Sequence, residues 1–359
     1  MTRRLRNLVF EGGGVKGIAY VGALEKLAEE ELLSEIENVG GTSAGAITAL
    51  MVGLGYTPEE IRKSMMDLNF SYFLESCRLP VKNVTDFSSW KDYFGNKWFI
   101  AWIWIFILFL RLYRNYGLCE GINVREWLSE AIKSKTGLEN PTFKELYSSD
   151  SGENLRKMYF IGSNLSEGTS EVYSLEDTED MRVIDAVRIS MSFPLAFAPV
   201  EKKGARVDGG IVRNYPIKLF DRVRYLRYGT DLKENIEIYD ERNEKERIEE
   251  EENKWFFNEE SLGFRLDSEE EIEWFTRNKK PEPTEIENVW EFLLRFINTV
   301  LSVQQSYHRR SEDWKRTAYI DTLGIKTLDF DLDKTSKLDL IEEGRKGVED
   351  WLEEHWSQD

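Results

Sequence analysis

The stretch "NLVFEGGGVKGIAYVGALEKL", residues 7–27, joins a short apolar run to a cluster of glycines and then to a run with helical periodicity. Apolar residues recur on one helix face after the glycines, so residues 5–10 predict a strand and residues 16–30 predict a helix. Three of the glycines also match the G-x-G-x-x-G pattern of dinucleotide-binding loops. The stretch raises the question of whether this loop binds a dinucleotide or serves a different chemistry.

The second predicted strand, residues 36–40, argues against a dinucleotide site. A dinucleotide-binding fold expects an acidic residue at the end of this strand, where it binds a ribose hydroxyl. Here the strand runs into Gly40 and Gly41, and the acidic residues Glu35 and Glu37 lie before it or at its start. The second anchor for a dinucleotide is therefore missing.

The predicted elements alternate between strand and helix along the first part of the chain. Residues 43–54 predict a helix of small residues, and Thr57-Pro58 is typical of the N-cap and first position of the next helix. Further helices are predicted at residues 123–135, from Thr142 onwards, and at residues 182–191, 287–310 and 338–356, and further strands at residues 158–163, 171–175, 317–320 and 327–331. This order indicates an α/β fold with a mainly parallel sheet covered by helices.

The composition limits the possible classes of function. The chain has 359 residues, of which 41% are hydrophobic, and a formal net charge of −18. A general nucleic-acid binder presents a basic surface, so we expect no nucleic-acid partner. Two cysteines, Cys77 and Cys119, are typical of a reducing compartment without a disulfide framework. Residues 1–10 hold no apolar core of signal-peptide length, so we expect a cytoplasmic protein.

The residues after the second strand form the pattern Gly41-x-Ser43-x-Gly45. A serine between a buried strand and a helix lies on a sharp turn, and flanking glycines permit the strained backbone of that turn. The helix that begins at Ala44 directs its N-terminus towards the serine, where its dipole favours an alkoxide. The amides of residues 12–14 carry no side chains that would block an oxyanion. We therefore interpret the opening loop as an oxyanion hole for a nucleophilic Ser43.

A nucleophilic serine also needs a base. The chain has two histidines, His308 and His355, and a Ser-His-Asp triad requires that one of them folds back onto Ser43. Asp208, in the run Arg206-Val207-Asp208-Gly209-Gly210, follows a short apolar strand and could serve directly as the base. The same Asp-Gly-Gly pattern is also typical of a tight turn without a catalytic role.

Three motifs occur in a defined order along the chain: Gly12-Gly13-Gly14-Val15-Lys16-Gly17, Gly41-Thr42-Ser43-Ala44-Gly45 and Asp208-Gly209-Gly210. Together they resemble the patatin-like phospholipase family. The stretch "VIDAVRISMSFPLAFAPV" from Val183, and Asn214-Tyr215-Pro216, resemble the same family. The resemblance covers residues 5–220 and extends to the elements after residue 317.

The resemblance implies a three-layer α/β/α fold with a mainly parallel central sheet and Ser43 on a nucleophile elbow. It implies a catalytic dyad of Ser43 and Asp208, with no histidine. The backbone amides that it assigns to the oxyanion hole are those of Gly12, Gly13, Gly14 and Val15. The residues that it assigns to motif support are Lys16, Gly17, Gly41, Gly45, Gly209 and Gly210. Lys16 stands where the family commonly has arginine, which keeps the charge but loses the planar fork.

The activity that the resemblance implies is that of a lipid acyl hydrolase of the phospholipase A type. Such an enzyme cleaves fatty-acyl esters of membrane phospholipids through an acyl-enzyme, with no metal and no cofactor. The expected partners are a phospholipid or another acyl-ester lipid and the membrane surface. Two alternatives are a carboxylesterase or thioesterase that acts on soluble acyl esters, and a non-catalytic lipid-binding protein on the same scaffold.

The domain organisation predicted from the sequence has three parts. Residues 1–230 form the catalytic core, with an apolar insertion at about residues 85–115. Residues 231–285, where acidic runs alternate with aromatic residues, are predicted to be an acidic insertion. Residues 286–359 are predicted to complete the same domain with helices and strands.

The apolar insertion contains an unbroken apolar run at residues 98–110, flanked by Lys97, Arg111 and Arg114. A helix of this length spans about 20 Å, which is shorter than the roughly 30 Å hydrocarbon core of a bilayer. One interpretation is a buried core helix or strand. The other is a membrane-docking wedge, which would make the protein peripherally membrane-associated; its candidate contact residues are Trp98, Trp102, Trp104, Ile105 and Phe109.

Overall fold

The computed structural model describes residues 4–75, 98–150, 152–200, 204–226, 239–277, 312–327 and 329–356. A seven-stranded sheet runs through the molecule in the order β5-β4-β2-β1-β8-β9, with β7 also paired to β4. The parallel strands are β1 (Asn7–Phe10), β2 (Asn38–Gly41), β4 (Lys157–Asn164), β8 (Ser261–Asp267) and β9 (Thr317–Asp321). The two antiparallel strands are β5 (Thr169–Tyr173) and β7 (Arg206–Asp208).

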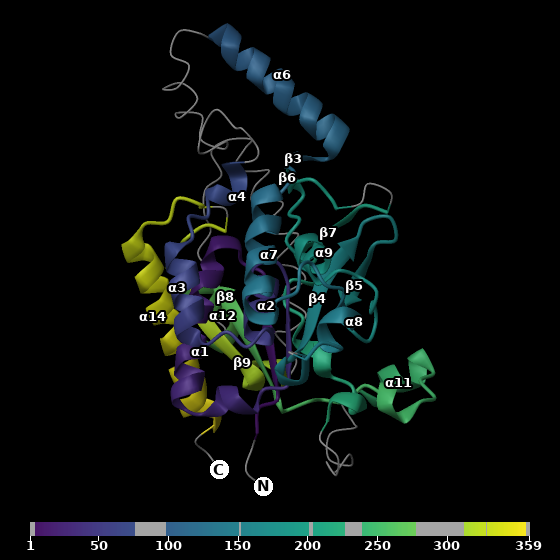
Figure 1. Cartoon of the computed structure of the whole chain (residues 1–359). Coiled ribbons are helices and arrows are strands. Elements are labelled where there is room, and N and C mark those ends of the chain that lie inside the picture. Colours follow the sequence, from purple (N-terminus) through teal and green to yellow (C-terminus); the bar gives the residue numbers. More distant parts are fainter. Residues whose placement is uncertain are drawn as a thin grey trace.

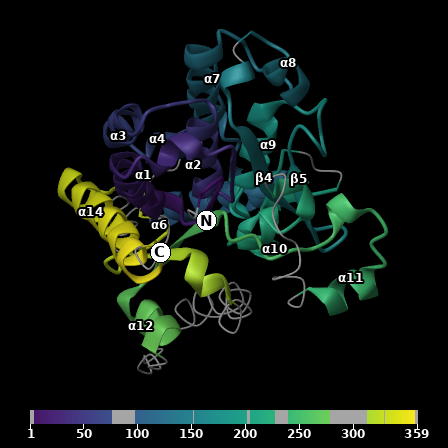
Figure 2. The same cartoon turned by 90° about the horizontal axis from the view of Figure 1, so that it is seen from below.

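Side chains alternate between the two faces of the sheet, and both faces are buried. On β1, Leu8 and Phe10 belong to the larger apolar core, whereas Val9 belongs to a second core on the opposite face. Helices cover the first face, and a segment of short helices from residue 210 to residue 225 covers the second. Figure 2 shows α2 and α9 on one side of β4 and α10 on the other. The predicted three-layer α/β/α fold with a mainly parallel sheet is confirmed.

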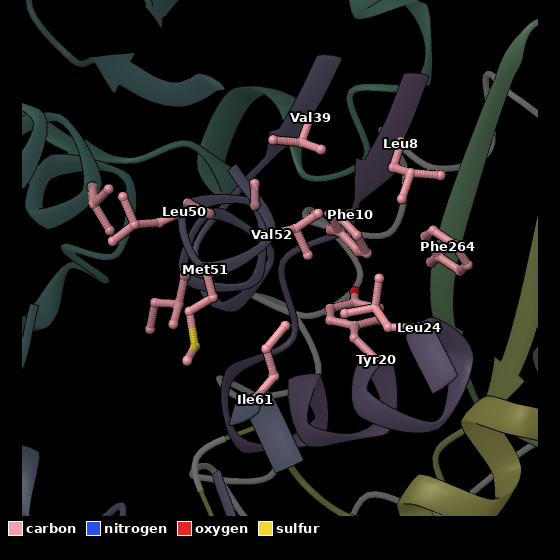
Figure 3. Close-up of a cluster of buried hydrophobic side chains, with 14 of the residues drawn as sticks. Leu8, Phe10, Tyr20, Leu24, Val39, Leu50, Met51, Val52, Ile61 and Phe264 are labelled. Atoms are coloured by element: carbon pink, nitrogen blue, oxygen red, sulfur yellow. The ribbon is translucent and has the colours of Figure 1, made fainter. Parts of the chain in front are cut away.

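The larger core joins three neighbouring strands to the helices of the first face. Figure 3 shows Leu8, Phe10, Val39 and Phe264 facing side chains of α1 and α2. The rings of Phe10 and Phe264 stack with their centroids 5.0 Å apart. The helices of this face are α1 (Tyr20–Glu29), α2 (Ala44–Gly53), α3 (Pro58–Asp67), α7 (Ile122–Thr136), α8 (Phe143–Tyr147), α9 (Val183–Ser190) and α14 (Lys334–Trp351).

The capping signals read from the sequence set the starts of two of these helices. Thr57 accepts a hydrogen bond from the amide of Glu60, and the Glu60 side chain accepts one from the amide of Thr57. Thr142 and Glu145 form the same reciprocal pair at the start of α8. Each pair satisfies two amides that the first turn of a helix leaves without partners.

The apolar run forms helix α6 (Trp98–Asn115), which leads into a small two-stranded parallel sheet. This sheet pairs β3 (Gly117–Cys119) with β6 (Leu195–Phe197). Figure 1 shows α6 standing apart from the main sheet, beyond β3, β6 and α4 (Tyr72–Glu75). Within the described residues, no helix has both the length and the hydropathy needed to cross a bilayer.

The acidic insertion predicted at residues 231–285 is wrong at its C-terminal half, because this range contains β8. This strand is buried over its whole length and lies between β1 and β9. Leu262, Phe264 and Leu266 face the larger core, while Arg265 and Asp267 are buried on the opposite face as an ion pair. The prediction failed because glutamates flank β8 on both sides in the sequence, so the strand resembled part of a solvated segment. Its own charged residues are paired in the interior.

The shorter helices of the described structure include α10 (Gly210–Arg213), α11 (Asp240–Glu246), α12 (Glu269–Arg277) and the 3₁₀ helix η1 (Gly14–Ala19) that precedes α1. The strand predicted at residues 327–331 does not form in the described residues there, which lie in turns. The helix predicted at residues 287–310 lies outside the described residues. Cys119 is disulfide-bonded, so the expected absence of disulfides is wrong and the cysteines do not argue for a reducing compartment.

Candidate active site

Ser43 lies on the tight turn between β2 and α2, and its backbone is strained. Its φ of 54° and ψ of −120° lie outside the regions that side-chain-bearing residues normally adopt. Both flanking glycines are required for steric reasons, since a Cβ on Gly41 would overlap the carbonyl oxygen of Gly45, and a Cβ on Gly45 would overlap that of Phe10. The amide of Ser43 donates to Ser190 Oγ at 3.1 Å, which ties the turn to α9. The predicted nucleophile-elbow geometry at Ser43 is therefore present.

Strand β4 brings Asp208 to this turn. The first half of β4 pairs with β2, where Gly41 lies opposite Phe160. Two residues further along β4, Gly162 lies opposite Asp208 at the end of β7. Because Ser43 follows the end of β2 and Asp208 ends β7, the two residues meet, and Ser43 lies close enough to lower the pKa of the Asp208 carboxyl group. The structure thus brings together the two residues that the sequence motifs paired.

The turn that follows Asp208 holds its carboxylate in place. The amide of Gly210 donates to Asp208 Oδ1 at 2.7 Å, and the amide of Asp208 donates to the carbonyl of Ser192 at 3.0 Å. Ser163 Oγ donates to the carbonyl of Gly209 at 3.3 Å. Gly209 lies so close to β4 that a Cβ there would overlap the carbonyl oxygen of Ile161.

The Asp208 carboxyl group is only 2% exposed, and burial raises its pKa to about 7. The hydrogen bonds from Gly210 and Ser43 oppose this shift without cancelling it. An aspartate with an ordinary pKa is a weak base at neutral pH, so a raised pKa improves its ability to accept a proton. Burial therefore gives Asp208 the chemical property that a general base at this position requires.

The glycine loop passes directly beside Ser43, since a Cβ on Gly12 would lie 3.1 Å from Ser43 Cβ. Two of its four candidate oxyanion donors are already engaged. The amide of Gly12 donates to the carbonyl of Asn214 at 3.2 Å, and the amide of Val15 donates to the carbonyl of Thr327 at 3.2 Å. The amides of Gly13 and Gly14 meet no acceptor among the described residues. In this conformation, these two amides are the available candidates.

The other glycines of the first motif allow close packing around the loop. Gly14 has a φ of +58°, and the carbonyl of Thr327 occupies the place that a Cβ on it would take. A Cβ on Gly17 would lie 2.8 Å from Ala44 Cβ, so η1 packs directly against the start of α2. Lys16, between them, is close enough to the buried Asp267 to oppose the rise in the pKa of that carboxyl group.

An apolar cavity opens beside Ser43. Its walls are apolar side chains from α3, α4, the segment after α9 and the segment after β9: Met65, Leu68, Phe70, Phe73, Met191, Phe193, Phe197 and Phe330. Gly14, Val15 and Thr327 also line it. A cavity with apolar walls that is also lined by a serine suits an apolar ligand such as an alkyl chain.

The histidines do not complete a triad in the described structure. The ring of His355 packs edge to face on Trp314, with 5.0 Å between ring centroids. Trp314 precedes β9, at the amino ends of the parallel strands, whereas Ser43 follows the carboxyl end of β2. His308 lies outside the described residues. Within the described ranges, no group of three or more His, Cys, Asp or Glu side chains is arranged to hold a metal ion.

Three polar residues that support the site were not singled out from the sequence. Ser190 holds the amide of Ser43, Ser163 holds the turn after Asp208, and Glu11 holds the side chain of Asn214. A signal for Glu11 was present, because a charged residue directly follows a buried strand and directly precedes three glycines. Ser190 and Ser163 carry no such local signal, since their roles depend on the packing of α9 and β4.

Comparison with known proteins identifies the family of this chain. Residues 8–221, more than half of the chain, match the family model described as patatin-like phospholipase. The chain therefore belongs to the patatin-like phospholipase family, as its three motifs predicted.

Two relatives illustrate the range of the family. YqhO of Bacillus subtilis, an uncharacterised protein, is 31% identical over 230 residues, which are 60% of this chain and 67% of YqhO. The probable lipid hydrolase 463L of Invertebrate iridescent virus 6 is 26% identical over 216 residues, which are 60% of this chain and 62% of 463L. The match thus spans about two thirds of the length of either relative.

The crystal structure of VipD from Legionella pneumophila shares the fold. It aligns with a TM-score of 0.53 and 17% sequence identity, over 98% of this chain and 67% of VipD. At this identity the likeness shows a common fold alone.

The burial of Asp208 predicts an unusual effect on stability. Its pKa is higher in the folded than in the unfolded protein, so its contribution to stability is present below about pH 4 and is lost as the pH rises towards 7. Asp208→Asn removes the ionisable group and keeps an acceptor for Gly210. We expect this variant to exceed the wild type in free energy of unfolding by about 2–4 kcal/mol at pH 8, with little difference at pH 4.

Urea denaturation at both pH values measures this difference. The matched control is Asp221→Asn, an equally buried aspartate that accepts from Arg316 Nη2 at 2.8 Å. Asp221→Asn leaves the buried charge of Arg316 with Asp313 as its carboxylate partner. Because a buried charge that loses a partner is costly, the free energy of unfolding should fall by about 3–5 kcal/mol. A destabilised Asp208→Asn at pH 8 would contradict the raised pKa.

Proposed function

We propose that this protein is a lipid acyl hydrolase of the phospholipase A type, with Ser43 as the nucleophile and Asp208 as its base. The observation that carries the proposal is the strained Ser43 beside a buried Asp208 whose pKa is raised to about 7. The open amides of Gly13 and Gly14 and the apolar cavity support the same chemistry. The family membership and the name of the viral relative 463L agree with a lipid substrate.

In the proposed mechanism, Asp208 accepts the proton of Ser43 as Oγ attacks the carbonyl carbon of the ester. The amides of Gly13 and Gly14 donate to the oxyanion, and the N-terminus of α2 favours the negative charge. The tetrahedral intermediate collapses, and Asp208 returns the proton to the departing alcohol or lysolipid. Water then attacks the acyl-enzyme with Asp208 again as base, which releases the fatty acid and restores Ser43.

The membrane surface is proposed as the site of action because of the exposed face of α6. Phe106, Phe109 and Tyr113 are 59%, 61% and 75% exposed, and with Ile103 and Leu110 they recur at helical spacing. An exposed apolar stripe on a helix is typical of a segment that lies in the bilayer interface. Of the docking residues predicted from the sequence, Phe109 lies in this stripe, whereas the side chains of Trp98, Trp102, Trp104 and Ile105 lie outside the described set.

The helix that carries the stripe is connected to the proposed acyl cavity through a short sheet. Helix α6 leads into β3, β3 pairs with β6, and Phe197 at the end of β6 lines the cavity beside Ser43. Phe73 on α4, below α6 in Figure 1, lines the same cavity. A helix that docks on a bilayer would thus place the cavity near the lipids, consistent with a peripherally membrane-associated enzyme.

Ser43→Ala should abolish hydrolysis of phosphatidylcholine vesicles and labelling by a fluorophosphonate, because the hydroxyl is the proposed attacking group. The fold should remain intact, since Ser43 lies on a turn and its amide contact to Ser190 is kept. Mass spectrometry of released fatty acid and of the labelled peptide measures both. Ser166→Ala, in the turn after β4, is the control and should react like the wild type. A label on a different serine in the Ser43→Ala variant would refute the assignment.

The value of kcat/KM should rise as the pH increases through about 7 and then level off, because a general base must be deprotonated in the free enzyme. Asp208→Asn should lower kcat at least about a hundredfold, which is the usual effect of losing a general base. His308→Ala and His355→Ala are the controls and should stay near the wild-type rate. A loss in either histidine variant as large as in Asp208→Asn would favour a histidine triad.

Replacing Phe106, Phe109 and Tyr113 together by serine should reduce sedimentation with phosphatidylcholine vesicles and hydrolysis of those vesicles. Hydrolysis of a soluble short-chain aryl ester should be unchanged, because the stripe does not touch Ser43. The control replaces Leu165, Trp314 and Leu338, which are exposed apolar residues elsewhere, and should keep both activities. Equal loss of both activities in the α6 variant would contradict docking, and a wild type active only on soluble esters would favour the carboxylesterase alternative.

A further inference from the structure

Glu11 lies between β1 and the glycine loop and is only 1% exposed. A buried carboxylate is costly unless hydrogen bonds and an opposite charge compensate it. Both of its oxygens are engaged here: Oε1 accepts from Asn214 Nδ2 at 3.1 Å, and Oε2 accepts from the amide of Leu266 at 2.9 Å. The guanidinium of Arg265 lies 3.9 Å from Oε2 and supplies the opposite charge.

The first partner, Asn214, forms hydrogen bonds with both the carbonyl and the amide of Gly12. Asn214 Nδ2 donates to the carbonyl of Gly12 at 3.0 Å, and the carbonyl of Asn214 accepts from the amide of Gly12 at 3.2 Å. Asn214 Oδ1 fills the position that a Cβ on Gly12 would take. Asn214 therefore sets the direction in which the chain leaves Gly12 towards Gly13 and Gly14.

The second partner, Leu266, supports the next residue of the loop. The amide of Leu266 is fixed by Glu11, and its side chain occupies the position that a Cβ on Gly13 would take. Glu11 thus anchors two supports of the loop at once, one from the segment after β7 and one from β8. The side chain of Glu11 interacts with Asn214, Leu266 and Arg265, so its link to Ser43 runs through the loop.

The charges around Glu11 fit a role in orientation. Arg265 also donates to Asp267 Oδ1 at 2.6 Å, so one arginine serves two buried carboxylates. Burial and the charge of Glu11 raise the pKa of Asp267 to about 7, against the effect of Arg265. Arg265 thus places one positive charge between two buried carboxyl groups beside the glycine loop.

We propose that Glu11 is a positioning residue that orients the Gly13 and Gly14 amides towards the oxyanion, through Asn214 and Leu266. This inference rests on the proposed function for its effect on rate. Its effect on the order of the loop is independent of the reaction.

The first test is kinetic. Glu11→Gln keeps the size of the side chain but turns one acceptor into a donor that faces Asn214 Nδ2 or the Leu266 amide. We expect kcat to fall about tenfold to a hundredfold, since misplaced oxyanion donors act in the transition state, with KM within about twofold of the wild type. Asp313→Asn is the matched control: it is an equally buried carboxylate, accepts from Arg316 Nη2 at 2.6 Å at the other end of the sheet, and should lose stability without losing kcat.

The second test is coupling. If Glu11 acts through Asn214, the double variant Glu11→Ala with Asn214→Ala should lose about as much kcat as the more damaging single variant. Losses that multiply would show that the two residues act separately and would overturn the inference.

The third test uses loop order rather than activity. Amide hydrogen exchange in peptides that cover residues 10–20 should accelerate at least about tenfold in Glu11→Gln and stay near the wild-type rate in Asp313→Asn. Unchanged kcat and unchanged exchange in Glu11→Gln would overturn the inference and leave the proposed hydrolase intact. Accelerated exchange in an enzyme that shows no hydrolysis and no fluorophosphonate labelling would instead overturn the proposed function and support the role of Glu11 in ordering the loop.

Discussion

The candidate site depends on the way in which β4 shares one of its edges between two strands. The parallel strand β2 occupies the first half of this edge and ends opposite Phe160, and the antiparallel strand β7 takes over at Gly162. This register places the end of β2 against the end of β7. Ser43 and Asp208, far apart in the chain, meet there for that reason. Gly41 and Gly209 lack a Cβ, which lets their backbone lie against the carbonyls of Gly45 and Ile161.

The same arrangement buries a carboxyl group where the protein would be more stable without its charge. Asp208 has no cationic partner among the interactions that set its pKa, whereas Asp221 shares its site with Arg316. The contrast separates two uses of a buried aspartate. Asp221, paired with an arginine, supports the fold, whereas burial without such a partner raises the pKa of Asp208 to about 7, where it can exchange a proton with a neighbouring hydroxyl.

The carboxyl ends of the central strands also gather the other parts of the site. Glu11, which follows β1, and Arg265, which lies in β8, are on one face beside the glycine loop, while the apolar cavity lies on the opposite face, among helices. Helix α6 extends from the small β3–β6 sheet (Figure 1), and Phe197 of this sheet lines the cavity. The β3–β6 sheet thus connects the apolar cavity to the helix that carries the exposed apolar stripe.

The sequence by itself determined the α/β class, the helices with clear periodicity and capping boxes, and the strained turn at Ser43, because these depend on local spacing and on glycines next to one another. It also pointed to Asp208, but only through a family resemblance, since Asp-Gly-Gly alone is an ordinary turn. It misassigned β8, whose Arg265 and Asp267 are buried as an ion pair among acidic neighbours. Only the tertiary structure decided which amides of the glycine loop are open, because Asn214 and Thr327, distant in sequence, engage those of Gly12 and Val15. Such contacts are set by the packing of strands and loops, which local sequence patterns do not specify.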